Sequence, residues 1–365
     1  MRAVPLVMAL VTVVSVGCVE PMRQVRGLEA RTLDQLCALE DDQVDLATAS
    51  LVIGWDLDRR SSIGYKQMQL DSISKRLGPR LAAVDDPRKK IALLSDILMN
   101  EFRMMPLGTT RPRRHGKMLD WVLDHNRGDC VGLSVLYLGI AERLDLPLKL
   151  ATAPGHVLVV WDDGDVQFYV ETTRSESVHD TSDYLEELLG PIRYRQFGGM
   201  HLEPLPPRQA LGVLIGQWGY GLSEQGRHDD ALQAYRRSLA INPRDSSVLF
   251  NLARELAVLG RTDEAEKVFA RCVKVNPRFA DAYSRWGVLL SEQKRYGDAL
   301  EKFDRALAVN PDDAMLHALA IMTLTRDDRP DEARRRLAAA RRRFPRIKVI
   351  WKHLAEDLDE DTSVN

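Results

Sequence analysis

Three residue types that can carry out acyl transfer lie within one stretch of the sequence, residues 127–173. Cys130 supplies a thiol, His156 an imidazole and Glu171 a carboxylate. A thiolate can attack an amide carbonyl, an imidazole can hold and return the proton, and a carboxylate can orient the imidazole. These three residues are therefore the candidate catalytic set, with the cysteine as the nucleophile.

The cysteine stands at the predicted start of a long apolar helix. Asp129 is a good N-cap residue, and residues 131–144 follow almost without a polar break. A thiol in the first helical turn faces unpaired backbone N–H groups and the positive end of the helix dipole, which favour the thiolate. The Asp129 carboxylate opposes this effect. A cation is therefore needed beside Cys130, and a protonated His156 is the candidate.

A predicted β-hairpin places the histidine and the carboxylate. The Asp-Gly pair at 163–164 favours a two-residue turn between strands 157–161 and 166–170. In that register His156 lies directly opposite Glu171, within reach of an imidazole–carboxylate hydrogen bond. Side chains alternate between the two faces of a hairpin, so one face is expected to be apolar and to pack on a core. Its members are Val157, Val159, Trp161, Val166, Phe168 and Val170.

Four motifs in this stretch resemble the bacterial transglutaminase-like superfamily, whose catalytic core is papain-like. The resemblance covers Leu28 to Met200 and implies an α+β domain, with a helical lobe and a small antiparallel sheet. It implies a triad in which Glu171 stands where many relatives have Asp. The motifs are Asp129-Cys130-Val131-Gly132-Leu133-Ser134, Leu144-Asp145-Leu146-Pro147, Pro154-Gly155-His156 and Val170-Glu171-Thr172-Thr173.

The activity implied is acyl transfer from an amide, as in a cysteine peptidase, an amidase or a transglutaminase. The backbone N–H of Cys130 is a candidate oxyanion donor, and Asn126 and Gln167 are candidates for a second one. Whether water or an amine accepts the acyl group stays open, and family analogy alone favours hydrolysis. Two alternatives remain: a Cys/His/Glu metal site, and a catalytically silent scaffold, because some relatives have lost the cysteine.

The N-terminal segment 1–18 has the pattern of a lipoprotein signal peptide. A basic Arg2 precedes an apolar run over residues 3–14, and small residues lead to Cys18, the expected lipidation site. Val19 follows rather than Asp, which in the lipoprotein pattern means no inner-membrane retention signal. We therefore expect a protein anchored in the cell envelope, in the outer rather than the inner membrane, facing the periplasm, with residues 19–29 as a tether.

Length and composition limit the remaining possibilities. A chain of 365 residues suggests two or three domains, and 51 basic against 53 acidic residues give no push toward nucleic acid. No nucleotide, haem or flavin fingerprint is present, so no cofactor is predicted. After the signal peptide three cysteines remain, an odd number that leaves at least one free thiol: Cys37, Cys130 and Cys272.

The α+β domain is assigned to residues 30–200. Its N-terminal part reads as a helical array in which Asp86 and Pro87 give a clear start signal for one helix. A basic loop, 111–117, is expected to be solvated surface or to contact a substrate carboxylate. A Gly- and Pro-rich stretch at 198–207 marks the domain boundary, and the linker is assigned to 201–211. The helices expected in this domain are 32–39, 43–53, 65–77, 87–104, 118–125 and 182–189.

In the C-terminal part, the same residue types recur at a fixed interval along the sequence. The interval equals the separation of Pro243 and Pro277, and it is the period of the tetratricopeptide repeat. Residues 212–347 are assigned to four repeats and 348–365 to a capping helix and tail. Asp328 stands where Gly226 and Gly260 do in earlier units, which indicates a degenerate last repeat. The series that share the period are Pro243, Pro277, Pro311 and Pro345; Ala231, Ala265, Ala299 and Ala333; and Tyr235, Phe269, Phe303 and Leu337.

Arrays of this family bind peptides in a concave groove, and by analogy Tyr220, Phe250 and Arg254 line it. A protein or peptide ligand is therefore the expected partner, together with the membrane through the lipid anchor. Arginines at 334–336 and 341–343 form a basic stripe, which is either a solvated helix face or a contact for anionic headgroups or an acidic partner. The whole chain is predicted to be an α+β domain followed by an all-α solenoid.

Overall fold

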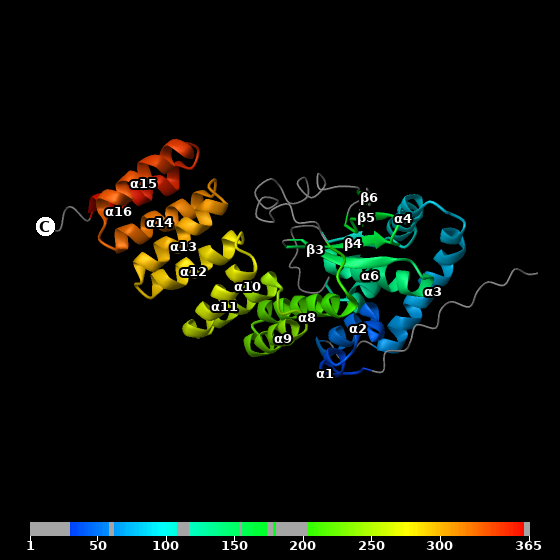
Figure 1. Ribbon diagram of the computed structural model, residues 1–365. Helices are drawn as coiled ribbons and strands as arrows, with labels where there is room; N and C mark the ends of the chain where they lie inside the picture. The colour runs from blue at the N-terminus through cyan, green and yellow to red at the C-terminus, as the bar shows by residue number, and fades with distance from the viewer. Residues whose placement is uncertain are drawn as a thin grey trace, which may run out of the picture.

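The computed structural model describes residues 30–57, 62–107, 117–153, 155–173, 178–179 and 203–360. The predictions that fall outside these residues include the signal peptide 1–18 with the lipidation site Cys18, the tether 19–29, most of the basic loop (111–116) and the helix expected at 182–189. Among the helices that are described, none combines the length and the apolar character needed to cross a membrane. Figure 1 shows an N-terminal α+β domain joined to a helical solenoid that ends at the C-terminus.

Helices form the first part of the N-terminal domain, as the sequence predicts, with some ends displaced. The fourth expected helix is shorter than 87–104, because its last part, Ile97–Glu101, takes up a π-helical turn. Its start agrees with the prediction, since the Asp86 carboxylate accepts the Lys89 N–H at 3.0 Å. The helices are α1 (Leu33–Cys37), α2 (Leu46–Leu57), α3 (Ile63–Ala82), α4 (Pro87–Asp96) and α5 (Leu119–His125).

Helix α6 (Cys130–Leu144) is the central element of this domain. It contacts the sheet on one side and helices α2, α3 and α5 on the other. Gly139 permits the close crossing with α2 and α3, because a Cβ there would lie 2.7 Å from side-chain atoms of both Ala47 and Leu70. A helix that is buried on nearly every side has no solvated face, which explains its almost unbroken apolar sequence.

An antiparallel sheet packs against α6, with strand order β3-β4-β5-β6. Strand β3 (Leu148–Ala153) pairs with β4 (His156–Asp162), and β4 pairs with β5 (Gln167–Val170), which pairs with β6 (Val178–His179). Of these pairings, only the β4–β5 hairpin is predicted from the sequence. A separate parallel pair leads into α6, formed by β1 (Met105–Pro106) and β2 (Arg127–Gly128).

The register of the β4–β5 hairpin differs from the prediction by two residues. A two-residue turn would pair Asp162 with Asp165, whereas Asp162 pairs with Gln167. The loop is longer because the Asp163 carboxylate accepts the backbone N–H groups of Asp165 at 3.0 Å and Val166 at 2.7 Å. Val166 is therefore a loop residue, 37% exposed, and not a member of the apolar face.

A shift of two residues keeps every strand residue on its predicted face. The apolar face therefore packs as expected: the other five predicted members are buried in one core with α6. The opposite face is buried as well, since Leu158 and Val160 are 0% exposed. This burial explains why β4 reads as a continuous apolar run rather than as a half-exposed strand.

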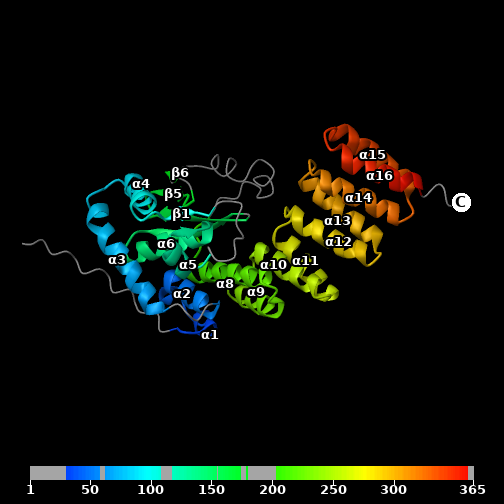
Figure 2. The ribbon, with the colours of Figure 1, turned by 180° about the vertical axis from the view of Figure 1, so that it is seen from behind.

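The solenoid contains the four predicted repeats, each a pair of antiparallel helices. Figure 1 and Figure 2 show the helices following one another in an arc that leads away from the N-terminal domain. The pairs are α8 (Pro207–Glu224) with α9 (His228–Ile241), α10 (Ser246–Val258) with α11 (Thr262–Val275), α12 (Ala280–Glu292) with α13 (Tyr296–Val309), and α14 (Ala314–Arg326) with α15 (Pro330–Arg343), followed by the capping helix α16 (Lys348–Glu360).

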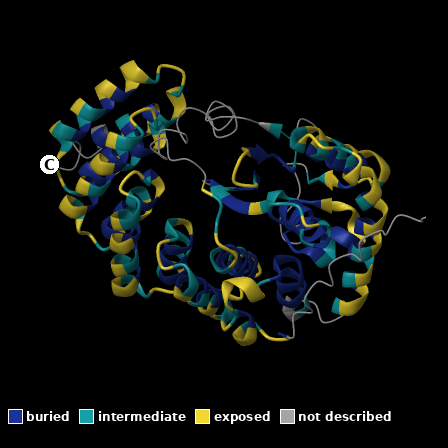
Figure 3. Cartoon of the chain, turned by 45° about the vertical axis from the view of Figure 1, so that its right-hand side comes forward, coloured by how far each residue is buried: buried dark blue, intermediate teal, exposed yellow. Residues whose placement is uncertain are grey.

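The regular spacing of small and large residues produces tight contacts inside each repeat. The alanines and the large residues at the two periodic positions are all buried, and Figure 3 shows the buried residues concentrated where helices meet. A Cβ on Gly219 would lie 2.9 Å from the Tyr235 ring, and one on Gly287 would lie 2.7 Å from the Phe303 ring. Asp328 adopts φ 54°, close to the φ of 75° at Gly226. The fourth repeat was expected to be degenerate at this position, but it keeps the same left-handed turn between its two helices.

The first repeat shares one hydrophobic core with the N-terminal domain. Helix α8 begins at Pro207, inside the segment 201–211 expected to be a linker, and it contacts α2 and β3. Leu214 and Trp218 belong to the same buried cluster as Ile53. The Leu205 N–H also donates to the Leu150 carbonyl at 2.8 Å. These contacts fix the repeats to the domain, and the expected end of the linker was wrong.

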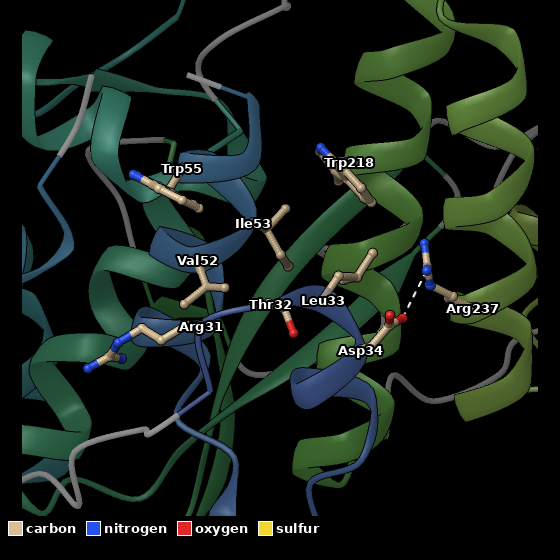
Figure 4. Close-up of a pocket in the computed structure, with 9 residues that line it drawn as sticks. All are labelled: Arg31, Thr32, Leu33, Asp34, Val52, Ile53, Trp55, Trp218 and Arg237. Atoms are coloured by element: carbon tan, nitrogen blue, oxygen red, sulfur yellow. Dashed lines mark ion pairs between the residues drawn. The ribbon is translucent and has the colours of Figure 1, made fainter. Parts of the chain in front are cut away.

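A cavity of about 280 Å³ lies in this junction. Figure 4 shows its lining from α1, α2 and the first repeat, with Trp218 on one side and the Asp34–Arg237 ion pair, 2.8 Å, on another. None of the candidate catalytic residues lines it. The cavity therefore belongs to the contact between the two parts of the chain and not to the catalytic candidates.

Candidate functional site

Cys130 is the first residue of α6, as the sequence predicts. The Asp129 carboxylate caps the helix by accepting the N–H groups of Val131 at 2.9 Å and Gly132 at 3.1 Å. These bonds use the two amides after Cys130 and not its own, and the role of the Cys130 N–H as an oxyanion donor stays a prediction. Cys130 is half-buried.

The histidine contacts both of the other candidate residues. His156 begins β4, and its Nε2 lies 2.8 Å from Oε2 of Glu171. Its imidazole is also close enough to the Cys130 side chain for an interaction that raises the imidazole pKa. The structure therefore brings the three residues together in the order thiol, imidazole, carboxylate, which is the arrangement that nucleophilic acyl transfer requires.

The His156–Glu171 contact is diagonal, whereas the sequence analysis predicts a direct cross-strand pair. Val159 pairs with Val170, so one further step in that register sets Glu171 level with Leu158 and not with His156. Diagonal neighbours on one face have Cβ atoms roughly 7 Å apart, a gap that only long side chains bridge. The additional methylene of Glu, compared with the Asp of many relatives, supplies part of this reach.

The surroundings of His156 favour its protonated form. Burial lowers the pKa of the imidazole, but its hydrogen bonds and charge interactions with Cys130 and Glu171 outweigh this effect and raise the pKa to about 9, from an ordinary 6.5. Near neutral pH the histidine is therefore the cation that the sequence analysis requires beside the thiol.

Sequence reasoning missed the residues that hold the carboxylate. Glu171 is completely buried, and its Oε1 accepts the backbone N–H of Thr173 at 2.8 Å and the hydroxyl of the same residue at 2.6 Å. The preceding Thr172 faces the other way, with its hydroxyl 3.3 Å from that of Ser134 on α6. Two threonines directly after the candidate carboxylate were the available signal in the sequence.

The two residues suggested for the second oxyanion donor have different outcomes. Gln167 pairs with Asp162 at the turn end of the hairpin. It is therefore separated from His156 by the length of β4, roughly 20 Å at 3.3 Å per residue, and the suggestion was wrong. Asn126 ends α5 in a left-handed conformation, φ 51°, close to α6 in sequence. Its role as a donor stays a prediction.

The other two described cysteines differ from Cys130. Cys272 is buried in the repeat core, and burial raises the pKa of its thiol to about 12. Burial also raises the pKa of Cys37. All three are free thiols. Within the part of the chain that the structure describes, no group of three or more His, Cys, Asp or Glu side chains is arranged to hold a metal ion.

The residues expected to line the peptide groove fall into two places. On α10 the Arg254 guanidinium lies 5.7 Å from the ring centre of Phe250, which also contacts Phe279 at 5.1 Å. Tyr220 on α8 instead faces the N-terminal domain, where the Lys117 ammonium lies 4.4 Å from its ring centre. The second repeat thus brings two of the three candidates together. The third candidate, Tyr220 in the first repeat, contacts the N-terminal domain.

Much of the basic stripe on the last repeat contacts other parts of the solenoid. Arg336 forms a bidentate pair with Asp304, at 2.7 and 3.0 Å, and Arg343 pairs with Asp312 at 2.6 Å. Arg341 donates to the carbonyl of Trp351 on the capping helix at 2.9 Å. These arginines connect neighbouring helices, which is a structural role that neither of the two expectations included.

Comparison with known families agrees with the domain types seen in the fold. Residues 65–215 match the model of the transglutaminase-like superfamily, and residues 222–284 and 290–349 match that of the tetratricopeptide repeat. The chain carries a transglutaminase-like domain followed by tetratricopeptide repeats. The transglutaminase-like match includes Cys130, His156 and Glu171, and it ends within α8, where the two parts share their core. The repeats are a module consistent with protein or peptide binding.

Several solved structures are similar to part of this chain. MamA from Desulfovibrio magneticus RS-1 is 21% identical over 42% of this chain and 94% of its own, with a TM-score of 0.35. YrrB, a TPR protein with an unusual peptide-binding site, is 15% identical over 48% and 88%, with a TM-score of 0.36. PilF of Pseudomonas aeruginosa is 19% identical over 43% and 71%, with a TM-score of 0.38. No curated protein matches the sequence.

Proposed function

We propose that this chain is an envelope lipoprotein whose transglutaminase-like domain performs acyl transfer from an amide of a protein or peptide held by the repeats. The observation that carries the proposal is the 2.8 Å contact between His156 and the buried Glu171 carboxylate, beside Cys130 at the start of a buried helix, where the imidazole also interacts with Cys130. A thiol in a merely structural position needs neither a histidine partner nor a buried carboxylate behind it.

The steps follow from the positions of the three side chains. His156 takes the proton of the Cys130 thiol, and the resulting thiolate attacks the amide carbonyl to form a tetrahedral intermediate. His156 then gives its proton to the leaving amine as the C–N bond breaks and the thioester remains. Water or an amine then attacks the thioester and gives a proton to His156. The C–S bond breaks, which releases the acyl product and regenerates the Cys130 sulfur as the leaving group. Glu171 keeps the imidazole oriented and compensates its charge throughout.

The developing oxyanion needs donors that are already in place. The helix cap leaves the Cys130 N–H unused by Asp129, and the positive end of α6 points at the same region. Each donor of this kind contributes about 3 kcal/mol to transition-state stabilisation in acyl-transfer enzymes.

The repeats are suited to present a substrate at a fixed position. The first repeat shares its core with the domain, so a peptide bound on α10 beside Phe250 and Arg254 is held at a constant distance from Cys130. An acidic or C-terminal group on the peptide would pair with the Arg254 guanidinium, and an apolar side chain would pack on Phe250.

The envelope location rests on the N-terminal segment 1–19. The basic Arg2, the apolar run 3–14 and the small residues before Cys18 favour export and lipidation. A single diacylglyceryl-type modification at that cysteine would leave the domain and the repeats outside the membrane.

Trapping of an acyl-enzyme tests the catalytic proposal. The purified chain is mixed with p-nitrophenyl acetate, and intact-mass analysis with peptide mapping follows the acetyl group. We expect a burst of p-nitrophenol and an acetyl thioester on Cys130 that is lost on Cys130→Ser. Decay of the thioester with and without an added primary amine then separates hydrolysis from transfer. Absence of any acylation at Cys130 would leave the repeats as the functional part of the chain.

The groove is tested by separating substrate binding from chemistry. Phe250→Ala should raise the KM for a protein substrate about tenfold, because a buried aromatic contact is lost, and leave p-nitrophenyl acetate turnover unchanged. An equal effect on both substrates would contradict a binding role.

The anchor is tested by Cys18→Ser in cells. We expect the protein to move from the membrane fraction to the soluble periplasmic fraction. Unchanged fractionation would contradict lipidation at this residue.

A further inference from the structure

The two oxygens of the Glu171 carboxylate have different partners. Oε2 faces His156 at 2.8 Å, whereas Oε1 accepts two hydrogen bonds from Thr173, at 2.8 Å from the backbone N–H and 2.6 Å from the hydroxyl. A carboxylate that is free to rotate exchanges its oxygens and its direction. Two donors on one oxygen oppose that rotation and aim the second oxygen at the imidazole.

Burial makes these donors necessary. Glu171 is 0% exposed, so water does not supply the hydrogen bonds that a charged carboxylate needs. Hydrogen bonds to the charged form of a carboxyl group favour that form. Any residue except proline at position 173 would supply the backbone N–H, but the shorter of the two bonds comes from the Thr173 hydroxyl.

The buried phenol of Tyr137, which interacts with the Glu171 charge, does not take the place of this hydroxyl. Tyr137 lies on α6 close enough to interact with Glu171, but its hydroxyl donates to Ser95 at 2.9 Å. Burial first, and the Glu171 charge as well, raise the pKa of Tyr137 to about 12. Tyr137 is therefore neutral, and its proton is directed away from the carboxylate.

The neighbouring threonine makes a different contact. The Thr172 hydroxyl lies 3.3 Å from that of Ser134, one helical turn beyond Cys130 on α6. Thr172 thus ties the segment to the helix that carries the cysteine, and Thr173 holds the carboxylate itself. Two adjacent residues of the same type therefore offer a matched pair for experiment.

We propose that Thr173 is a positioning residue, whose hydroxyl fixes the Glu171 carboxylate so that it orients His156 for acyl transfer at Cys130. This inference rests on the proposed function and names a residue outside its triad. The two hydrogen bonds of Thr173 go to the Glu171 carboxylate, so the residue is assigned to act through the carboxylate.

The test uses three threonine variants and Glu171→Gln as a reference. The ionisation of the His156 imidazole is followed by NMR, and the alkylation of Cys130 by iodoacetamide is followed by intact mass. We expect Thr173→Val to lower the titration midpoint of His156 and to slow alkylation about tenfold, because one hydrogen bond to a charged group is lost. Thr173→Ser, which keeps the hydroxyl, should restore both. Thr172→Val should lower Tm without moving the titration midpoint.

The outcomes separate this inference from the proposed function. If Glu171→Gln shifts the His156 midpoint and Thr173→Val does not, the role of Thr173 is refuted while the triad stands. If Thr172→Val shifts the midpoint as much as Thr173→Val, the effect is a general one on the segment, and the inference is also refuted. If Glu171→Gln itself changes neither readout, the orienting role of the carboxylate fails, and the proposed mechanism fails with it.

Discussion

Replacing Glu171 by glutamine removes the charge that faces His156 and keeps the size of the side chain. In the native protein the carboxylate Oε2 lies 2.8 Å from the imidazole, in a position that is closed to water. In the variant the Thr173 donors still select an oxygen, so the amide NH₂ group is the one left facing the imidazole. An NH₂ group does not accept a hydrogen bond, and a protonated imidazole loses its acceptor.

The size of the effect follows from the lost interaction. A hydrogen bond to a charged group contributes about 1.5–3 kcal/mol, and about 1.4 kcal/mol corresponds to one pH unit in a titration midpoint. We therefore expect the His156 midpoint, about 9 in the native protein, to fall by about 1 to 2 pH units. The contact with Cys130 remains in the variant and accounts for any elevation that is left.

Imidazole NMR across a pH series measures this midpoint directly. Asp162→Asn is the matched control, because it removes a carboxylate at the other end of the same strand, where it pairs with Lys149 at 2.7 Å. The control should leave the His156 midpoint unchanged. A His156 midpoint that is the same in Glu171→Gln and in the native protein would refute the reasoning, since the carboxylate would then contribute nothing to the imidazolium.

Three further predictions concern reach, pH and packing. Glu171→Asp keeps the charge but shortens the side chain, so the carboxylate no longer reaches His156 across the diagonal gap. We therefore expect a His156 titration midpoint close to that of Glu171→Gln. The pKa of His156 is raised in the fold from 6.5 to about 9, so its protonated form stabilises the fold fully below about pH 6.5, and this contribution is lost as the pH rises through 9. The difference in unfolding free energy between the native chain and His156→Gln should therefore shrink from up to about 3 kcal/mol toward zero over that range. In α8, Gly219→Ala should lower the unfolding free energy by about 1–3 kcal/mol, because its Cβ would lie 2.9 Å from the Tyr235 ring. Gly221→Ala meets nothing within 4 Å and should raise it by about 0.5–1 kcal/mol.

Each of these has a result that would count against it. An aspartate variant with a native His156 midpoint would mean that the diagonal gap does not limit the contact. A stability difference that grows with pH would reverse the sign expected for a raised histidine pKa. If Gly219→Ala and Gly221→Ala changed the unfolding free energy equally in urea, the contact between α8 and α9 at Gly219 would not be tightly packed.

Local signals in the sequence were sufficient for the catalytic helix and the repeats. Asp129 followed by an apolar run predicts a capped and buried helix. Because Asp129 is the N-cap, the helix begins at Cys130. The constant repeat period fixes the positions of Ala231 and Tyr235 and their equivalents, because each repeat is one unit that buries the same face.

The register of the hairpin was not available from the same kind of signal. An Asp-Gly pair favours a two-residue turn, but the Asp163 carboxylate also bonds to the Trp161 indole at 2.8 Å, and it caps a longer loop. The choice between the two turns depends on where Trp161 packs. That packing is a tertiary contact, which local sequence signals do not show. The longer loop shifts the strand register by two residues, and the contact between His156 and Glu171 is therefore diagonal.

The boundary between the two parts was missed for a related reason. Gly and Pro residues in 198–207 indicate a break in regular structure, but they do not show whether the next helix packs on the preceding domain. Trp218 is a repeat residue by its spacing, and nothing in that spacing predicts that it is buried in the same core as Ile53. Which face of α8 the domain covers is decided by shape, and only the fold shows it.

The reactivity of Cys130 tests the central claim most directly. A pulse of iodoacetamide near neutral pH, read by intact mass and peptide mapping, compares Cys130 with Cys272, whose thiol has a pKa of about 12 because it is buried. We predict that Cys130 is alkylated much faster than Cys272 in the native chain, and that His156→Ala removes most of this advantage. A Cys130 that reacts as slowly as Cys272, or equally fast with and without His156, would contradict a catalytic thiol in this protein.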